Sequence, residues 1–233
     1  MKITAIMATC GRHYCSERSL SLFLEQNYQD KHLLIYQNSE VQQRLSECID
    51  PSLVTLVNNS MDMNTHQPYI SLGAIYNDAI KHLPVDTDIV TFWDDDDLFF
   101  DDHLSEGIRG LIRGGKTAYK PASSYFRTQA GMTKERNTFE PSIFVKASHI
   151  FKYGFHRTTT DQHLKWLEPL LADSDIYVDE DGKSTLIYNW SDEVLLYKTS
   201  GHSYKPDHFD EYRSLSYDHG DRIIAPIPVF NTL

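Results

Sequence analysis

Short apolar runs alternate along this chain with longer segments in which apolar residues recur every three or four positions. Four runs have the length and the β-branched character of buried strands. They cover residues 3–8, 33–36, 53–57 and 89–93. Residues 17–27 and 72–83 place apolar side chains at helical spacing, and the second segment stops at Pro84. Strands that alternate with helices across short connections predict an α/β fold, with a mainly parallel sheet flanked by helices on both faces.

Polar side chains follow the strands at their carboxyl ends. Thr9 and Arg12 come after the first strand, and Gln37 and Asn38 come after the second. Open parallel sheets bind their ligands outside the carboxyl ends of the strands. These four side chains are therefore expected to lie on one edge of the sheet, where they could contact a ligand.

The fourth strand ends in four consecutive aspartates at positions 94–97. Adjacent anions repel one another, and the repulsion grows near a low-dielectric core. A hard divalent cation with oxygen ligands would relieve it. In an extended chain Asp94 and Asp96 point the same way, so both can serve one ligand. The alternative is a solvated acidic loop, the usual state of a charge run.

Composition narrows the setting. The chain has 233 residues, 40% of them hydrophobic and 12% aromatic, as in a packed globule. We expect a single domain over residues 1–233, because no Pro-, Gly- or Ser-rich linker is present. Its two functional halves would be residues 1–102 and 103–233.

The formal charge is −11, and six of the negative charges belong to positions 94–97, 101 and 102. Such acidity argues against a nucleic-acid-coating protein, although a local basic groove stays compatible with it. Three cysteines without a Cys-x-x-Cys pair favour a reducing compartment. The apolar start is too short for a signal core and no run reaches the length of a membrane span, so a cytoplasmic protein is expected.

The order of these motifs resembles the GT-A glycosyltransferases of family 2. Their opening strand, Pro-Thr-x-x-Arg-like turn and helix ending in Ser-x-x-x-Gln are similar to residues 6–12 and 19–26. Their second strand resembles residues 33–39, and their helix with a central Asn resembles residues 74–80, which contain Asn77. Their Asp-x-Asp metal motif resembles residues 93–96. The likeness runs in continuous order over residues 3–102 and is loose beyond them.

The resemblance implies a GT-A, Rossmann-like fold and a nucleotide-sugar donor whose diphosphate is held by Mn²⁺ or Mg²⁺. Thr9 and Arg12 would border the nucleoside, and Asp94 would approach the ribose and the metal. Asp96 would bind the metal. Asp95 matches the variable middle position and would point away from the metal. Asp97 would contact the metal ligands without binding the metal itself.

The chain departs from the family pattern at three places, and the identity of the donor's nucleobase stays open. Relatives often carry Asp after the second strand, where this chain has Gln37 and Asn38. An amide can meet uracil or guanine, since it both donates and accepts. Tyr76 stands where relatives often have Arg, and Ala8 replaces the usual Pro. UDP is the default expectation on family prevalence.

The acceptor and the general base are expected in the second half. Family 2 enzymes invert the anomeric centre, with a carboxylate that takes the acceptor proton. Asp161 opens a predicted helix in the matching place, although Thr160 or Asp161 could equally cap that helix. Asp192 and Glu193 are the alternatives. Some GT-A enzymes use a late His as a further metal ligand. The resemblance makes His202, which follows a strand-like run, a candidate for this role, and imidazole suits Mn²⁺.

The sequence thus predicts a metal-dependent, inverting glycosyltransferase that moves one sugar to an acceptor hydroxyl. The acceptor could be a glycan, a protein, a small molecule or a modified nucleobase. A nucleotidyl- or phosphotransferase would use the same carboxylate chemistry but release pyrophosphate or phosphate. A non-catalytic cation- or carbohydrate-binding module would bind no nucleotide.

Overall fold

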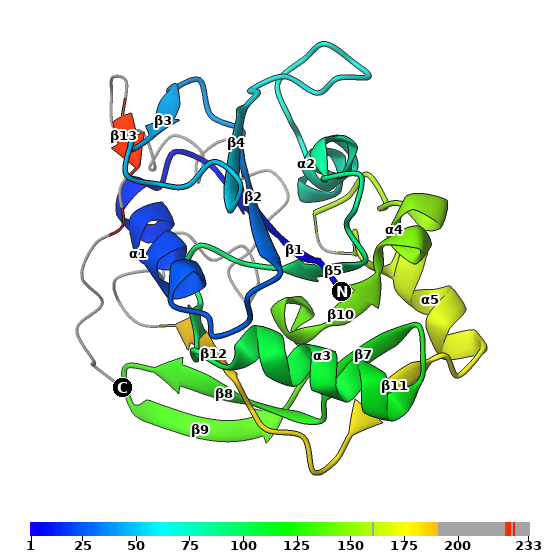
Figure 1. Cartoon of the computed structure of the whole chain (residues 1–233). Helices are drawn as coiled ribbons and strands as arrows, with labels where there is room; N and C mark the ends of the chain where they lie inside the picture. The colour runs from blue at the N-terminus through cyan, green and yellow to red at the C-terminus, as the bar shows by residue number, and fades with distance from the viewer. Residues whose placement is uncertain (160, 191–221, 225, 227–233) are drawn as a thin grey trace.

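The computed structural model describes residues 1–159, 161–190, 222–224 and 226. Its centre is a seven-stranded sheet in the order β11-β7-β10-β5-β1-β2-β4 (Figure 1). The strands are β1 (Ile3–Thr9), β2 (Lys31–Gln37), β4 (Val54–Asn58), β5 (Ile89–Phe92), β7 (Ala118–Pro121), β10 (Phe144–Lys146) and β11 (Ile176–Asp179). Strand β10 runs antiparallel to both β5 and β7, and the other pairs are parallel. The predicted α/β class is therefore confirmed.

In the described part of the chain, five α-helices cover the two faces of this sheet (Figure 1). They are α1 (His13–Leu24), α2 (Leu72–Ala79), α3 (His103–Gly114), α4 (Ala147–Tyr153) and α5 (Leu164–Ala172), with 3-10 turns η1 (Ile80–His82) and η2 (Glu140–Ser142). Helices α1 and α3 share one apolar core with the sheet, and α2, α4 and α5 share the other. In the described part of the chain, no helix has the length and apolar character needed to cross a membrane.

The helix limits differ from the sequence expectation for local reasons. Helix α1 starts directly after Arg12, four residues before the predicted segment. Helix α2 passes into η1, and Leu83 takes up an extended conformation next to Pro84. A residue before proline avoids the helical region, which accounts for this end.

A second sheet of four strands lies beside the carboxyl end of β5. Its order is β6 (Leu98–Phe99), β12 (Leu186–Trp190), β8 (Ser123–Thr128) and β9 (Gly131–Arg136). The Phe99 ring stacks on Trp93 with 3.7 Å between centroids, which joins this sheet to the first core. A third, two-stranded sheet pairs β13 (Arg222–Ile224) with β3 (Gln43–Leu45).

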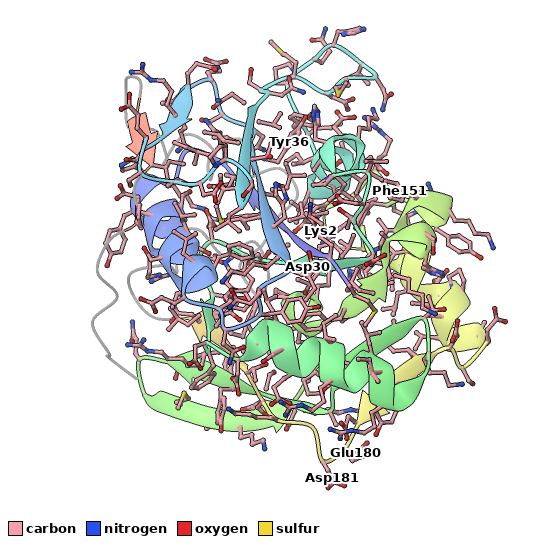
Figure 2. The ribbon with its side chains drawn as sticks, viewed as in Figure 1. Lys2, Asp30, Tyr36, Phe151, Glu180 and Asp181 are labelled. Carbon is pink, nitrogen blue, oxygen red and sulfur yellow. The ribbon has the colours of Figure 1, made fainter. Side chains whose placement is uncertain are left out.

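A buried polar network fixes α2 to the second and third parallel strands. The hydroxyl of Tyr36, labelled in Figure 2, lies 2.9 Å from that of Tyr69. Tyr69 donates in turn to the buried carboxylate of Asp78 in α2, at 2.7 Å. The side-chain amide of Asn59 donates to both hydroxyls, at 2.8 and 3.1 Å. The loop between β4 and α2 is thereby attached to the body.

Glycines let α3 approach the sheet closely. A Cβ at Gly107 would lie 2.3 Å from the Phe144 ring, and one at Gly110 would lie 2.2 Å from the Tyr119 ring. Aromatic side chains of β10 and β7 therefore fill the space that side chains on the helix would otherwise take.

Gly107→Ala is expected to destabilise the fold by about 1–3 kcal/mol through overpacking, although Ala favours helix by about 1 kcal/mol over Gly. Chemical denaturation measures the difference. Ile112→Ala, at an α3 position that is 66% exposed, is the control and should change stability little. A more stable Gly107→Ala protein would contradict the close packing of α3.

His103 is buried among the rings of Trp93, Phe99 and Phe144. Its Nδ1 lies 2.8 Å from Thr185 Oγ1, and burial lowers the pKa of His103 to about 4. The folded protein thus binds fewer protons here than the unfolded chain between pH 6.5 and 4. This contribution to stability is complete above pH 6.5 and is lost as the pH falls.

His103→Gln is therefore expected to make the free energy of unfolding less dependent on pH between 6.5 and 4. The full effect of His103 corresponds to about 3 kcal/mol. His32, whose pKa burial also lowers to about 4, keeps its own contribution in both proteins. The exposed His156→Gln is the control; an equal pH slope in the native and His103→Gln proteins would refute the assignment.

Candidate functional site

Three of the four aspartates after β5 converge. Asp94, Asp96 and Asp97 each offer one carboxylate oxygen, and these oxygens lie within 4.8 Å of one another. Asp97 is fully buried, Asp96 is nearly so, and Asp94 is partly exposed. Clustered carboxylates are the hard oxygen ligands that Mg²⁺ and Mn²⁺ accept. This group could hold a metal ion, with Asp94 on its accessible side.

Helix α1 holds the backbone of the acidic turn. The Arg18 guanidinium donates to the Asp96 carbonyl oxygen at 3.1 Å, and the Ser19 hydroxyl donates to that of Asp94 at 3.4 Å. The indole of Trp93 donates to the Ser19 carbonyl at 3.1 Å. The turn is thus fixed against the helix that follows β1.

Strand β12 holds the same turn from the second sheet. The backbone N–H of Asn189 donates to Asp97 Oδ1 at 3.0 Å, and its side-chain amide donates to the Asp96 carbonyl at 3.1 Å. A hydrogen bond from N–H to a carboxylate stabilises the ionised form. Asn189 is fully buried and was not identified from the sequence.

Asp95 binds the end of β1 and the turn that follows it. Its Oδ2 accepts hydrogen bonds from Thr9 Oγ1 at 2.7 Å and from Arg12 Nε at 3.0 Å. Arg12 also forms an ion pair with Asp95 Oδ1 and reaches Asp96 Oδ2 at 3.2 Å. Burial alone would lower the pKa of Arg12, but the charges of Asp95 and Asp96 outweigh it and raise the pKa. Arg12 therefore remains a cation inside the acidic cluster.

Cys15 of α1 is a buried cysteine near this cluster. Burial and the Asp95 charge raise the pKa of Cys15 to about 11, so Cys15 stays protonated at neutral pH. Cys10 is half-buried and Cys48 is exposed.

The predicted residues after β2 lie on the same edge of the sheet. The Asn38 N–H donates to the Thr9 carbonyl at 2.9 Å, which places it next to the end of β1. The Gln37 amide is fully buried and binds its own loop, donating to Ser39 Oγ at 2.7 Å and to the Val41 carbonyl. In this conformation Gln37 shapes the turn rather than presenting its amide to a ligand.

Asn77 has a connecting role in this structure. Its amide donates to the carbonyls of Gly73 and Phe155 at 2.7 and 2.9 Å, and its Oδ1 accepts from the Phe155 N–H at 2.9 Å. It therefore joins α2 to the segment after α4. Its expected contact with a donor stays a prediction.

Asp161 lies in the turn before α5 and is exposed. Its carbonyl oxygen accepts a hydrogen bond from the Leu164 N–H at 3.2 Å. The residue at the N-cap of α5 is His163, and no side chain caps this helix. The helix therefore begins later than the sequence suggested, and Asp161 is not its N-cap. Asp192, Glu193 and His202 lie outside the described residues.

A carboxylate that the sequence analysis missed, Glu140 of η2, lies at the same sheet edge. Strand β10 pairs with β5 so that Phe144 faces Thr91, and the Thr91 hydroxyl donates to the Ile143 carbonyl at 2.9 Å. Continuing this antiparallel register brings η2 beside the end of β5. Burial raises the pKa of Tyr76, and the next causes are the charges of Asp94 and Glu140, which both lie near this phenol. Only the antiparallel register reveals this position.

No protein-family model and no curated protein sequence matches the chain. Solved structures match it by shape. S. aureus TarS 1-349 in complex with UDP-GlcNAc has a TM-score of 0.60 and 14% identity, over 93% of this chain and 65% of that one. A longer S. aureus TarS structure has a TM-score of 0.58 and 14% identity, over 91% of this chain and 42% of that one.

A second kind of neighbour is the mannosyltransferase PcManGT from Pyrobaculum calidifontis, in complex with GDP-Man and Mn²⁺. Its TM-score is 0.57 and its identity is 14%, over 80% of this chain and 56% of that one. This chain thus spans between 42% and 65% of the length of these three neighbours. At such identities the likeness concerns the fold: the chain has a GT-A-like glycosyltransferase fold.

Proposed function

We propose that this protein is a metal-dependent, inverting glycosyltransferase that moves one sugar from a nucleoside-diphosphate sugar to an acceptor hydroxyl. The observation that carries the proposal is the group of Asp94, Asp96 and Asp97 at the carboxyl edge of the parallel strands. Neighbours of the same fold were solved with UDP-GlcNAc or with GDP-Man and Mn²⁺, which supports this class of donor.

The three carboxylates would hold Mn²⁺ or Mg²⁺. The metal would neutralise the diphosphate as it leaves, an electrostatic task suited to a divalent ion. Asp94, the most accessible of the three, is the one best placed to meet the ribose as well. His202 remains a proposed further ligand.

The nucleoside would lie at the ends of β1 and β2, near Thr9, Arg12 and Asn38, with Asn77 as a further proposed contact. Arg12 already donates to Asp95 and Asp96. We therefore propose that it positions these two carboxylates more than it contacts the donor. Gln37 would have to release its own loop in order to read a base. We propose UDP as the donor nucleotide.

For the acceptor step we propose Asp161 as the general base, with Asp192 and Glu193 as alternatives. The carboxylate would take the proton of the acceptor hydroxyl while that oxygen attacks the anomeric carbon. The bond between the anomeric carbon and the diphosphate breaks at the same time, and its electron pair leaves with the diphosphate. One displacement of this kind inverts the anomeric centre.

We further propose that residues 1–102 form the donor half and residues 103–233 the acceptor half of one domain. The acceptor would be a glycan, a protein, a small molecule or a modified nucleobase. We propose a cytoplasmic setting, which three cysteines without a Cys-x-x-Cys pair favour.

Asp96→Asn is expected to abolish metal-dependent binding of UDP, because one anionic ligand is lost. Thermal melting with and without Mn²⁺ and UDP measures this, since a ligand that binds the folded state raises the melting temperature. Asp101→Asn removes one charge from an exposed neighbour and should behave as the native protein does. Unchanged Mn²⁺-dependent UDP binding in Asp96→Asn would rule out the metal assignment.

Asp161→Asn is expected to keep donor binding and to lose transfer by about 10²–10⁴-fold, the usual worth of a general base. Release of UDP from UDP-GlcNAc, with water as the acceptor, is the assay. Asp173→Asn, at the exposed end of α5, is the matched control. Undiminished turnover in Asp161→Asn would move the base to Asp192 or Glu193.

A further inference from the structure

Glu140 binds two consecutive side chains with its two carboxylate oxygens. Oε2 accepts a hydrogen bond from the Gln162 amide at 2.9 Å, and Oε1 lies 3.0 Å from His163 Nδ1. Gln162 is buried, and Glu140 and His163 are partly buried. One carboxylate thus fixes both residues that follow Asp161.

The charges around His163 favour its protonated form. Burial alone would lower the pKa of His163, but the close contact with the negative charge of Glu140, together with the charge of Asp161, raises it above its ordinary 6.5. Lys120 acts in the opposite direction. Below that pKa, His163 is an imidazolium in contact with the Glu140 carboxylate.

The contact between Glu140 and His163 connects the turn of Asp161 to the sheet edge that carries Asp94. Glu140 belongs to η2, which adjoins the end of β5, and its charge acts on Tyr76 together with that of Asp94. Gln162 and His163 precede α5 on the other side of this contact. Glu140 thus contacts the residues next to Asp161 and also lies near Asp94, although Asp161 and Asp94 are distant in sequence.

Asp161 itself is exposed, so its position depends on its neighbours. Upstream, the Thr158 carbonyl accepts from the Gly73 N–H at 2.9 Å, and Asn77 holds Phe155. Downstream, the Gln162 carbonyl accepts from the His156 N–H at 2.9 Å. The side chains of Gln162 and His163 add the contact between this turn and Glu140 of η2.

We propose that Glu140 and protonated His163 form a positioning pair that holds Asp161 toward the acceptor hydroxyl. This inference rests on the proposed function, and it adds a pH dependence to it. When His163 loses its proton, the charged contact with Glu140 disappears and the turn loosens. Turnover should therefore fall as the pH rises through the pKa of His163.

The first test is the NMR titration of the histidine ring protons, in which His163→Gln identifies the His163 signal. In the native protein this signal should titrate above 6.5. In Glu140→Gln and in Asp161→Asn its midpoint should move to lower pH, because a neighbouring negative charge is gone. The exposed His156→Gln is the control and should leave the His163 midpoint in place. An unmoved midpoint in Glu140→Gln would overturn the pair.

The second test is the pH profile of kcat for UDP release from UDP-GlcNAc. In Glu140→Gln the alkaline fall should shift to lower pH, and in His163→Gln it should vanish, with kcat lowered roughly tenfold or more. The KM for UDP-GlcNAc, the binding of UDP with Mn²⁺ and the melting temperature should stay close to native. If the two residues had only a structural role, the melting temperature would fall instead.

Failure of the Glu140–His163 pair and failure of the proposed glycosyltransferase function give different results in these tests. Native pH profiles in both variants, or loss of UDP binding in Glu140→Gln, would overturn the positioning role. A native protein that releases no UDP at any pH would count against the proposed function instead, and the titration of His163 would still decide whether the pair exists.

Discussion

The structure depends on the way four adjacent carboxylates are accommodated at the end of a buried strand. Two unit charges 4 Å apart repel by about 4 kcal/mol at an effective dielectric constant of 20. The protein divides the four between two directions. Asp95 turns to Arg12 and Thr9, whereas Asp94, Asp96 and Asp97 face one another. Arg12 pairs with Asp95 and also contacts Asp96, and the group of Asp94, Asp96 and Asp97 could hold a cation.

The fold brings this arrangement about with contacts from both sheets. Helix α1 holds the acidic turn by the backbone carbonyls of Asp94 and Asp96. Asn189 of β12 holds it from the other side. Three of these contacts go to backbone carbonyls and one goes to Asp97 Oδ1, and Arg12 also reaches Asp96 Oδ2. The three carboxylates still bring one oxygen each within 4.8 Å of one another. The buried aromatic stack of Trp93 and Phe99 fixes the strand that carries them.

Local patterns were sufficient to predict the parallel core. Apolar runs indicate buried strands, so the sequence was enough to locate the first strands and the acidic turn and to predict the fold class. The pairing of Arg12 with Asp95 spans 83 residues, and no local pattern contains it. Glu140 was missed because its place follows from the antiparallel register of β10. Gln37 was expected to face a ligand, but the turn after β2 uses its amide internally.

The most direct test of the central claim is a calorimetric titration of the native protein with UDP and with GDP, each with and without Mn²⁺. The account predicts saturable binding of one diphosphate that requires the metal, because the three carboxylates repel an anion unless a cation lies between them. Binding of equal strength without Mn²⁺, or no binding of either nucleotide, would contradict it.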